Sequence, residues 1–403
     1  MISVEEQLRV IRSGTAQIVP ESALVDKLKR GKKLNVKLGV DPTAPDIHLG
    51  HAVPLRKLRQ FQDLGHQVTL IIGDGTALIG DPSGRNTTRP QLTREQIQAN
   101  AQTYVDQAYR ILDPDKTTLR YNSEWLLSLD LEGLLKIASS FTVARILERD
   151  DFHNRYTGNL PISLHEFLYP IMQAYDSVVI EADVELGGTD QLFNLLAGRE
   201  LMEKMGMEPQ VCLTLPLLEG TDGVQKMSKS YGNYIGLTDE PADMFGKVMS
   251  IPDELMVKYF RLASTHSVDE IDEIEKGLAA QELHPNKVKR SLARNVVAAY
   301  HGDEAAADAE GEFDLVFKQH AVPDDVPEFP ADLTPNDEGK VYLAKLLSDA
   351  GLAASAGDAR RLIDGGGVKV DGEAVPPKAY NVDPALLQGA VIQVGKRKFM
   401  RLV

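Results

Sequence analysis

Two histidines stand three residues apart in the stretch DIHLGHAVPLRKL, and their surroundings decide what chemistry they can do. His48 and His51 flank Leu49 and Gly50, and this spacing would place both imidazoles on one face of a helix. Imidazoles bind metals, transfer protons or bind anions. A zinc site of the H-E-x-x-H kind would need a carboxylate or further ligands at fixed offsets, which the stretch does not offer. The pair is therefore not predicted to hold a metal.

The histidines come just before a segment with helical periodicity. Its apolar stripe consists of Leu55, Leu58, Phe61 and Leu64. The helix is predicted to begin near Gly50 and to end at Gly65, with Pro54 in its first turn, where a missing N–H costs little. Free backbone N–H groups and the helix dipole favour an anion at such a start. A simpler role as a polar helix cap stays open for one of the two histidines.

A second group of reactive side chains lies far downstream, in EGTDGVQKMSKSYGN. Lys226, Ser228, Lys229 and Ser230 place two ammonium groups and two hydroxyls in a loop flanked by glycines. Such groups bind phosphates and stabilise negative charge that develops during a reaction. Alone, this segment would be interpreted as a solvated loop. Together with the histidines, it indicates a phosphate site divided between two distant parts of the chain.

Alternating extended and helical patterns in the first half of the chain predict how these groups are positioned. Apolar runs typical of strands occur at residues 34–40, 67–72, 177–188 and 211–218, with longer helical stretches between them. This alternation predicts a mostly parallel sheet flanked by helices. Because ligands of such sheets bind beyond the carboxyl ends of the strands, chemistry is expected in the loops after Val40, Ile72, Leu186 and Leu218.

The second half of the chain is predicted to be helical from about Tyr231 to Gln319. Residues 322–339 then carry four prolines among acidic side chains, which indicates an extended linker. The remaining residues contain two amphipathic helical patterns and a hairpin signal at Asp371-Gly372.

Charge is distributed unevenly along the 403 residues. The formal net charge is −15, yet the residues from Lys340 onward carry ten basic and six acidic side chains, a balance of +4 that leaves −19 on the rest. A basic tail on an acidic body suggests that the tail binds an anion such as nucleic acid, although a solvated surface would explain the same excess. The length predicts two or three domains.

The sequence also bears on the cellular compartment. No apolar run is long enough to span a bilayer, and the N-terminal segment fits neither a signal nor a transit peptide. The single cysteine, Cys212, lies in an apolar run and can form no internal disulfide. A cytoplasmic protein is therefore expected, with Cys212 as a buried apolar residue.

Two of these motifs carry a resemblance to a known family. The segments 48–51 and 226–230 resemble the HIGH and KMSKS signatures of class I aminoacyl-tRNA synthetases. Within this class the chain is most similar to the bacterial tyrosyl-tRNA synthetases, because GVDPTAPDIHLGH, LIGDPSGR, YPIMQAYD, GGTDQLFN and KMSKS occur in that family's order and approximate spacing. The resemblance covers essentially the whole chain. It implies a Rossmann-type α/β catalytic domain at 1–230, an α-helical anticodon-binding domain at 231–320, a Pro-rich acidic linker at 321–339 and a small S4-like α+β RNA-binding domain at 340–403.

The resemblance implies a reaction in two steps. The carboxylate of L-tyrosine attacks the α-phosphate of ATP to give tyrosyl-adenylate and pyrophosphate, and the 3′ end of tRNA(Tyr) then takes the tyrosyl group. Because a carboxylate is already ionised, the first step needs alignment and stabilisation of the leaving charge rather than a general base. The catalytic residues implied are Thr43, His48, His51, Lys226 and Lys229. Further ATP contacts are implied for Asp41, Gly50, Gly187, Gly188, Asp190, Met227, Ser228 and Ser230. Mg2+ is expected to come with ATP, held mainly by the nucleotide and not by a protein metal site.

The tyrosine pocket must bind an ammonium group, a carboxylate and a phenol. By resemblance, Tyr169, Gln173 and Asp81 are assigned to the ammonium group. Asp176 is assigned to the phenolic hydroxyl, and Gln191 to the region of the carboxylate. A polar partner for the hydroxyl rejects phenylalanine, because that partner would then be buried and unpaired. Without the resemblance, YPIMQAYD would be interpreted as an amphipathic core helix.

Two positions depart from the family pattern. Many members carry a tyrosine as the second phenol partner where this chain has Lys37. A lysine there could donate to the phenol, which makes it a candidate tyrosine-binding residue, or it could leave the pocket altogether. In either case more of the discrimination falls on Asp176. The second departure is Pro54, where other members carry a different residue.

The resemblance also implies a homodimer, with tRNA(Tyr) bridging its subunits, and no membrane association. Contacts with tRNA are assigned to the basic residues Arg360, Arg361, Lys369, Lys396, Arg397 and Lys398. Two other hypotheses stay open. Tryptophanyl-tRNA synthetases share the fold and both signatures, and a non-catalytic RNA-binding relative would keep the fold but lose signature residues. The QAYD segment and the C-terminal module favour tyrosine, and both signatures are intact.

Overall fold

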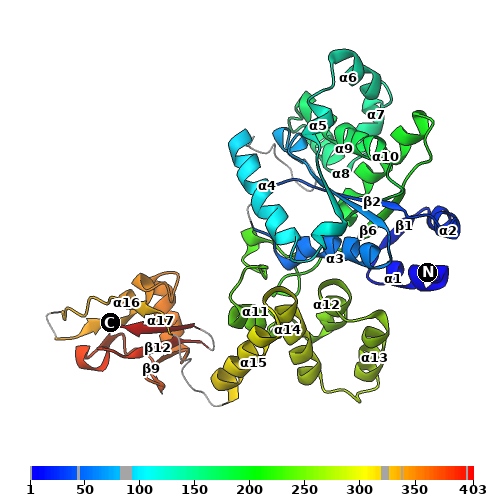
Figure 1. Cartoon of the computed structure of the whole chain (residues 1–403). Coiled ribbons are helices and arrows are strands. Elements are labelled where there is room, and N and C mark those ends of the chain that lie inside the picture. The colour runs from blue at the N-terminus through cyan, green and yellow to red at the C-terminus, as the bar shows by residue number, and fades with distance from the viewer. Residues whose placement is uncertain (1, 43–45, 82–92, 319–325, 337–338, 396–397) are drawn as a thin grey trace. The chain divides into compact units, whose positions relative to one another are not determined.

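The computed structural model describes residues 2–42, 46–81, 93–318, 326–336, 339–395 and 398–403. The chain divides into two compact units, residues 1–303 and 304–403 (Figure 1). Among the helices of the described ranges, none combines the length and the apolar character that a bilayer crossing requires.

A six-stranded sheet forms the centre of the first unit. Its strands are β1 (Gln17–Val19), β2 (Asn35–Val40), β3 (Gln67–Ile72), β4 (Thr117–Tyr121), β5 (Val184–Gly188) and β6 (Val211–Leu215). They lie in the order β1-β6-β5-β2-β3-β4, and all neighbours are parallel except β1 and β6. The chain runs outward from β2 through β3 to β4, and outward on the other side from β5 to β6. The strand order therefore reverses between β2 and β5, which is where ligands of such sheets bind.

Helices connect these strands and cover the sheet. They are α1 (Val4–Arg12), α2 (Glu21–Lys29), α3 (Leu49–Asp63), α4 (Arg94–Ala108), α5 (Ser123–Leu126), α6 (Leu131–Ala138), α7 (Val143–Ile146), α8 (Asp150–Thr157), α9 (Leu168–Val179) and α10 (Leu192–Lys204). Helices α9 and α10 pack closely against each other (Figure 1). Every residue of β6 is buried, as are five of the six residues of β3. This burial explains the nearly continuous apolar runs from which parallel strands were predicted.

The helix that follows the two histidines differs from its prediction in one respect. It begins at Leu49, with His48 as the residue that caps it, so Pro54 is its sixth residue and not part of the first turn. The predicted position of Pro54 is therefore wrong. Because proline has no N–H, the carbonyl of Gly50 receives no helical hydrogen bond from it.

The predicted strand at residues 177–188 is also only partly correct. Helix α9 continues to Val179, and β5 starts at Val184. The β-branched Val178 and Val179 favour a strand locally, but the packing of α9 against α10 outweighs that preference. The short strands β1 and β4 were not predicted.

Helices continue after the sheet, as predicted. The first unit ends with α11 (Pro241–Met249), α12 (Met256–Ala263), α13 (Val268–Ala279) and α14 (Pro285–His301), and both α11 and α12 pack against α14. Helix α14 has its proline at the start and Gly302, with a φ of 91°, at its end, as the sequence indicated. Helix α15 (Asp303–Lys318) belongs to the second unit except for its first residue, and Gln319 lies outside the described residues.

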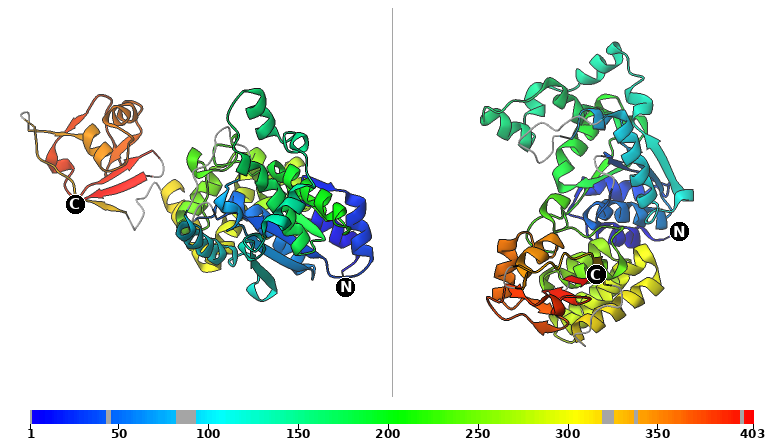
Figure 2. Two further views of the ribbon diagram at one scale, coloured as in Figure 1. Left: turned by 90° about the horizontal axis from the view of Figure 1, so that it is seen from above. Right: turned by 90° about the vertical axis from the view of Figure 1, so that its left-hand side faces the viewer.

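The second unit is built around a five-stranded sheet in the order β10-β9-β12-β13-β7. Its elements are β7 (Glu328–Phe329), β8 (Val341–Tyr342), α16 (Leu343–Asp349), α17 (Ala356–Asp364), β9 (Val368–Val370), β10 (Glu373–Ala374), β11 (Asn381–Val382), β12 (Val391–Val394) and β13 (Lys398–Leu402). Helices α16 and α17 lie together beside the strands (Figure 2) and share an apolar core with them. The predicted hairpin is present, because Asp371 and Gly372 adopt the positive φ values of a two-residue turn.

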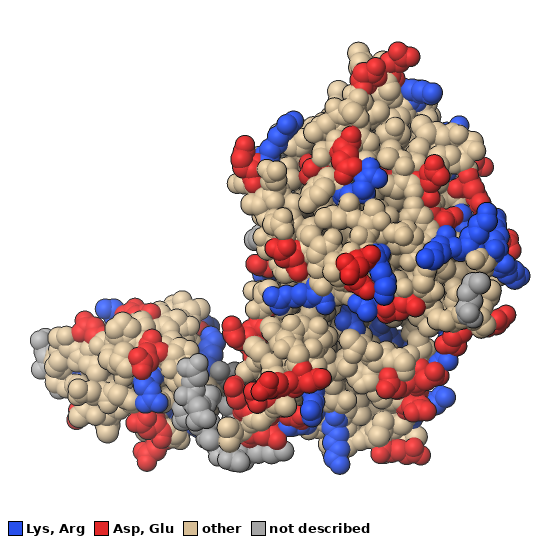
Figure 3. All heavy atoms as spheres, in the orientation of Figure 1, with Lys and Arg blue, Asp and Glu red and all other residues tan. Residues whose placement is uncertain are grey.

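Part of the predicted linker belongs to this sheet. Glu328 and Phe329 form β7, which pairs in parallel with β13, and Val326 is buried. The prediction of an extended linker is therefore wrong for this stretch. The prolines favoured the prediction of a linker, but proline is also tolerated in an edge strand such as β7. On the face shown in Figure 3, basic and acidic side chains are interspersed over the second unit.

Candidate active site

The predicted site residues of the first unit gather at the carboxyl ends of β2 and β5. Asp41 directly follows β2, and Gly187 and Gly188 end β5. Since β2 and β5 are parallel neighbours, both ends meet at one edge of the sheet. A side chain at Gly187 would lie 3.0 Å from Leu195 and 3.1 Å from Gln191, so glycine allows helix α10 to start close to the strand.

The two histidines lie at the start of α3, as predicted. Their rings stack with centroids 3.8 Å apart, and the backbone N–H of His48 donates to Nδ1 of His51 at 3.4 Å. The side chain of His48 is only 6% exposed, and its Nδ1 has no hydrogen-bond partner among the described residues. Burial lowers the pKa of His48 to about 3, and the charges of His51 and Lys229 act in the same direction. His48 is therefore neutral at pH 7 and offers a hydrogen-bonding nitrogen, not a charge.

Backbone hydrogen bonds tie the histidine segment to the chain that follows the lysine loop. The N–H of Leu49 donates to the carbonyl of Ile235 at 2.9 Å, and the N–H of Leu237 donates to that of Ile47 at 3.0 Å. In addition, a side chain at Gly50 would lie 3.5 Å from Cβ of Met227. The structure thus brings together the two motifs that the sequence separates.

The two lysines of residues 226–230 differ in their surroundings. The Lys229 ammonium pairs with the carboxylate of Asp46 and lies 5.8 Å from the centre of the Tyr234 ring. Ser228 accepts a hydrogen bond from the N–H of Ser230, while Met227 is buried. Lys226 is exposed, and its positive charge opposes the rise that desolvation causes in the pKa of Asp190.

One residue that fixes this loop was missed in the sequence. Asn233 is buried and accepts a hydrogen bond from the N–H of Ser228 at 2.8 Å. Its amide donates to Asp222 at 2.9 Å and to the carbonyls of Gln225 and Lys226 at 3.3 Å each. The only signal was the Tyr-Gly-Asn sequence right after the loop, which also fits an ordinary turn.

Helix α9 contributes Asp176, a buried acceptor, to the group of site residues at these strand ends, which we call the cleft. Asp176 is 3% exposed and accepts hydrogen bonds from Trp125 Nε1 at 2.8 Å and Asn122 Nδ2 at 3.3 Å. Burial raises the pKa of Asp176 to about 6, against the opposing effects of the Lys37 charge and these two donors. Asp176 therefore remains largely ionised at pH 7. Trp125 and Asn122 were missed, because they follow a strand that was not predicted.

Tyr169 and Asp41 are linked in the same cleft. The Tyr169 hydroxyl donates to Oδ2 of Asp41 at 2.9 Å, and the Thr76 hydroxyl donates to Oδ1 at 2.8 Å. Burial and the neighbouring Asp41 carboxylate raise the pKa of Tyr169, so this tyrosine stays protonated and acts as a donor. Asp41, assigned to ATP from the sequence, is thus held by a residue of the predicted tyrosine pocket.

The ammonium group of Lys37 is bound by neighbouring residues of the protein and does not remain available for a phenol. Lys37 is fully buried, and its ammonium donates to Glu185 at 2.9 Å, to Ser177 at 2.8 Å and to the carbonyl of Gln173 at 3.1 Å. An ammonium has three N–H donors, and these three acceptors use them. The contacts contradict the assignment of Lys37 as a phenol donor and favour the alternative in which it leaves the pocket.

Replacing Lys37 by methionine is expected to lower the free energy of unfolding by about 3 kcal/mol, because it leaves Glu185 buried without its cation. Urea unfolding followed by circular dichroism measures this loss. The matched control is the double variant Lys37→Met with Glu185→Gln, which removes both charges and should lose clearly less. Equal losses in the two variants would contradict a stabilising role for the ion pair.

Three other predicted tyrosine-site residues form one hydrogen-bonded group. Asp81 accepts from Gln191 Nε2 at 3.1 Å, and Asn194 donates to the side-chain oxygens of Gln191 at 2.9 Å and Gln173 at 3.0 Å. A buried arginine, Arg149, also pairs with Asp81 at 3.1 Å. Asn194 and Arg149 had not been singled out in the sequence. Asn194 ends the GGTDQLFN segment but was given no role there, and Arg149 stands in no recognisable motif.

The remaining predicted residues lie elsewhere. Arg360 and Arg361 are exposed on α17, Lys369 is half-buried on β9, and Lys398 is exposed at the start of β13. Arg361 pairs with Asp358 at 3.1 Å. Thr43, Lys396 and Arg397 lie outside the described residues. Among the described residues, no group of three or more His, Cys, Asp or Glu side chains could hold a metal ion.

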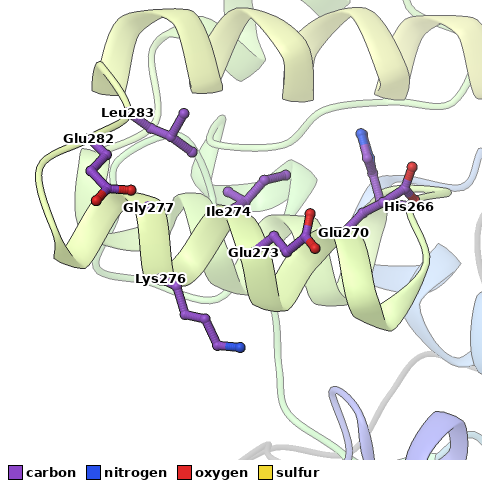
Figure 4. A pocket seen from close by; sticks show the side chains of 8 residues that line it. All are labelled: His266, Glu270, Glu273, Ile274, Lys276, Gly277, Glu282 and Leu283. Carbon is purple, nitrogen blue, oxygen red and sulfur yellow. The ribbon is translucent and has the colours of Figure 1, made fainter.

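A surface hollow lies on α13, and Figure 4 shows the side chains that line it. Its lining residues are His266, Glu270, Glu273, Ile274, Lys276, Gly277, Glu282 and Leu283. It forms where the chain turns back after the helix, since the N–H of Leu283 donates to the carbonyl of Gly277 at 3.1 Å. None of the predicted site residues that the structure describes lines it, and it is best explained as the consequence of this turn.

Comparisons with known proteins agree with the motifs. A family model described as tRNA synthetases class I (W and Y) matches residues 29–318, and an S4 domain model matches residues 343–385. A tyrosine–tRNA ligase from Moorella thermoacetica is 54% identical over 403 residues, covering 99% of this chain and 96% of that protein. One from Thermotoga maritima is 50% identical over 398 residues, covering 99% and 97%. The crystal structure of the Archaeoglobus fulgidus tyrosyl-tRNA synthetase complexed with L-tyrosine has a TM-score of 0.64 at 25% identity and covers 76% of this chain and 99% of that one. The resemblance and the α/β fold class with a C-terminal S4 domain are thereby confirmed.

Proposed function

Because the chain belongs to the class I tRNA synthetases of the tyrosyl and tryptophanyl family, we propose that it activates L-tyrosine with ATP and transfers it to tRNA(Tyr). The observation that carries the choice of tyrosine is Asp176, a buried carboxylate held by two donors in the cleft. An ionised acceptor at this depth matches a phenolic hydroxyl, and it penalises phenylalanine, which cannot donate to it. Tyrosine–tRNA ligases that are about half identical over the whole chain support the same choice.

The amino-acid side of the cleft would bind the rest of tyrosine. Tyr169, Gln173 and Asp81 are proposed to bind the ammonium group, and Gln191 is proposed to lie near the carboxylate. The mutual hydrogen bonds among Gln173, Asn194, Gln191 and Asp81 support this grouping. Lys37 would act only through its charge, from behind Asp176.

The other side of the cleft would bind ATP. His48, His51, Thr43 and the two lysines of residues 226–230 are proposed to contact its phosphates, and Asp190 its ribose. The buried, unpartnered Nδ1 of His48 supports a polar ligand at this position. Main-chain contacts are proposed at Gly50, Gly187, Gly188, Met227, Ser228 and Ser230. Mg2+ is proposed to arrive with ATP, held by the nucleotide's own phosphates.

In the first step, a carboxylate oxygen of tyrosine forms a bond to the α-phosphorus while the bond to the bridging oxygen breaks and pyrophosphate leaves. Because the nucleophile is already ionised, the step needs no general base. Because His48 is neutral at pH 7, it contributes hydrogen bonds and not a positive charge. The protein would align two anionic groups and stabilise the pyrophosphate with Lys226 and Lys229 as its charge develops.

The tRNA would be bound by residues 231–320, as an anticodon-binding domain, and by residues 340–403, as an S4-like domain that includes Arg360, Arg361, Lys369 and Lys398. We also propose a cytoplasmic homodimer. Large apolar side chains exposed between α5 and α9 support a subunit interface there. They include Leu131, Leu135, Val143 and Leu164.

Exchange of radioactive pyrophosphate into ATP, measured with each of the twenty amino acids, tests this function. Exchange is expected with tyrosine and with no other amino acid. Exchange with tryptophan alone would identify the tryptophanyl alternative. Absence of exchange with every amino acid would favour a non-catalytic RNA-binding relative.

A further inference from the structure

Arg149 is a buried cation in the amino-acid half of the cleft that the proposed function leaves without a role. It stands directly before α8 and is only 4% exposed. Buried arginines are rare unless paired. Its guanidinium donates to three different segments: to Asp81 at 3.1 Å, to Asn194 on α10 at 3.2 Å, and to Asp151 on α8 at 2.7 Å.

The hydrogen bond to Asn194 fixes the direction of a chain of amides. Because Arg149 is only a donor, it must face Oδ1 of Asn194, which leaves Nδ2 as the donor to both Gln173 and Gln191. The side-chain oxygens of these two glutamines are then acceptors. Their amide nitrogens are turned the other way, with that of Gln191 donating to Asp81 at 3.1 Å and that of Gln173 approaching Glu185 at 3.4 Å.

The same guanidinium also holds Asp81. One carboxylate oxygen accepts from Arg149 and the other from Gln191, so the plane of the carboxylate is set from two sides. Asp151 brings a second negative charge to Arg149. The three charges sum to one negative charge, which suits a substrate ammonium group. Without the arginine, two carboxylates would face each other, and Asp81 would no longer be held in place.

We propose that Arg149 is a positioning residue for the ammonium side of the amino-acid site, orienting Asp81 and setting the direction of the Asn194, Gln173 and Gln191 amides without contacting the substrate. This inference rests on the proposed tyrosine site. It predicts that losing Arg149 weakens recognition of the ammonium group and leaves recognition of the phenol and of ATP intact.

The test uses the full-length protein and the Arg149→Met variant, which keeps a long side chain but removes the charge and the donors. In pyrophosphate exchange, its KM for tyrosine should rise about tenfold, as expected for lost hydrogen bonds to charged groups, while its KM for ATP stays within about twofold. Inhibition constants of two tyrosine analogues locate the loss. Tyramine, which keeps the ammonium group, should bind about tenfold more weakly. 3-(4-Hydroxyphenyl)propionate lacks the ammonium group, and its carboxylate would meet only Gln191 of this group, so its loss should stay within about twofold.

Arg145→Met is the matched control, because Arg145 lies on the neighbouring helix α7 and pairs with Glu148 on the surface. It should leave all four constants unchanged. Should Arg149→Met fail to fold, Asn194→Leu has a similar branched shape, adds no charge, and removes the amide donors to both glutamines together with the acceptor for Arg149; it should weaken tyramine selectively as well.

Three results would overturn the inference: an unchanged KM for tyrosine in the Arg149 variant, an equal loss for both analogues, or a loss confined to the propionate. The last would mean that Arg149 acts on the carboxylate side of the substrate, directly or through Gln191. If the unaltered protein shows no exchange with tyrosine, the proposed function fails and the inference falls with it. Normal exchange combined with any of the three results refutes the role of Arg149 alone.

Discussion

Replacing Lys229 by alanine is expected to slow formation of tyrosyl-adenylate by about 10³-fold, while the dissociation constant of tyrosine changes by less than about threefold. The rate is expected to change more than the affinity because of where Lys229 lies. Lys229 lies at the histidine end of the cleft, paired with Asp46 and close to the Tyr234 ring. Negative charge develops on pyrophosphate only as the reaction proceeds, so a cation placed there stabilises the transition state more than the bound substrates.

The measurement is a single-turnover rate of adenylate formation combined with equilibrium binding of tyrosine. Lys276→Ala is the control, because Lys276 is a lysine of α13 that lines the separate hollow in Figure 4. It should leave both quantities unchanged. Equal losses of rate and of tyrosine affinity in the Lys229 variant would mean that Lys229 supports the cleft in general and has no specific role in the transition state.

The pairing of Lys229 with Asp46 is compatible with this role. Asp46 is half exposed and Lys229 is one-third exposed, and ion pairs at such exposure contribute about 0–1 kcal/mol. A phosphate group can therefore replace Asp46 at little cost. The firmer attachment of the loop is Asn233. Its side chain accepts from the N–H of Ser228 and donates to the carbonyls of Gln225 and Lys226. The loop is thus anchored through its backbone, and its cationic side chains remain available.

The sequence was sufficient to predict most of the parallel strands and the loops that follow them. Parallel strands are apolar over their whole length, and their carboxyl ends collect polar loops, so β2, β3 and β6 and the residues after them were correctly identified. The prediction that His48 and Lys229 lie near each other depended on the resemblance, because no local pattern links segments so far apart. The structure adds the backbone bonds, such as that from Leu49 to Ile235, that hold them together.

Other residues could not be placed from the sequence, because their partners come from elements that meet only in the folded chain. The alternating pattern of residues 34–40 does not show that Lys37 is buried. Its ammonium group lies inside the protein because it pairs with Glu185 of the neighbouring β5. Arg149 finds acceptors on three segments. Pro54 was misplaced because the start of the helix was predicted only approximately, near Gly50, whereas the helix begins at Leu49 after its cap at His48. Caps rather than periodicity decide such boundaries.

Removing residues 319–403 is expected to leave pyrophosphate exchange with tyrosine within about twofold of normal, but to lower the rate of tRNA(Tyr) charging by about 10³-fold at moderate salt. The structure changes where the chain must be cut. An end at residue 339 would leave β7 and the buried Val326 without β13, which pairs with β7 through Arg401 and Leu402. Ending at Lys318 removes the whole five-stranded sheet and exposes no strand that has lost its partner.

The physical reason for the unequal effects is that the two reactions need different parts of the chain. Adenylate formation uses only the cleft at β2 and β5, whereas binding of tRNA gains from basic side chains that release counterions from its phosphates. Arg360 and Arg361, both exposed on α17, are the natural candidates. In the full-length protein, Arg360→Glu with Arg361→Glu should therefore reduce charging and weaken its dependence on salt, with exchange unchanged. Charging that survives the truncation at full rate would show that residues 319–403 are not needed to hold tRNA.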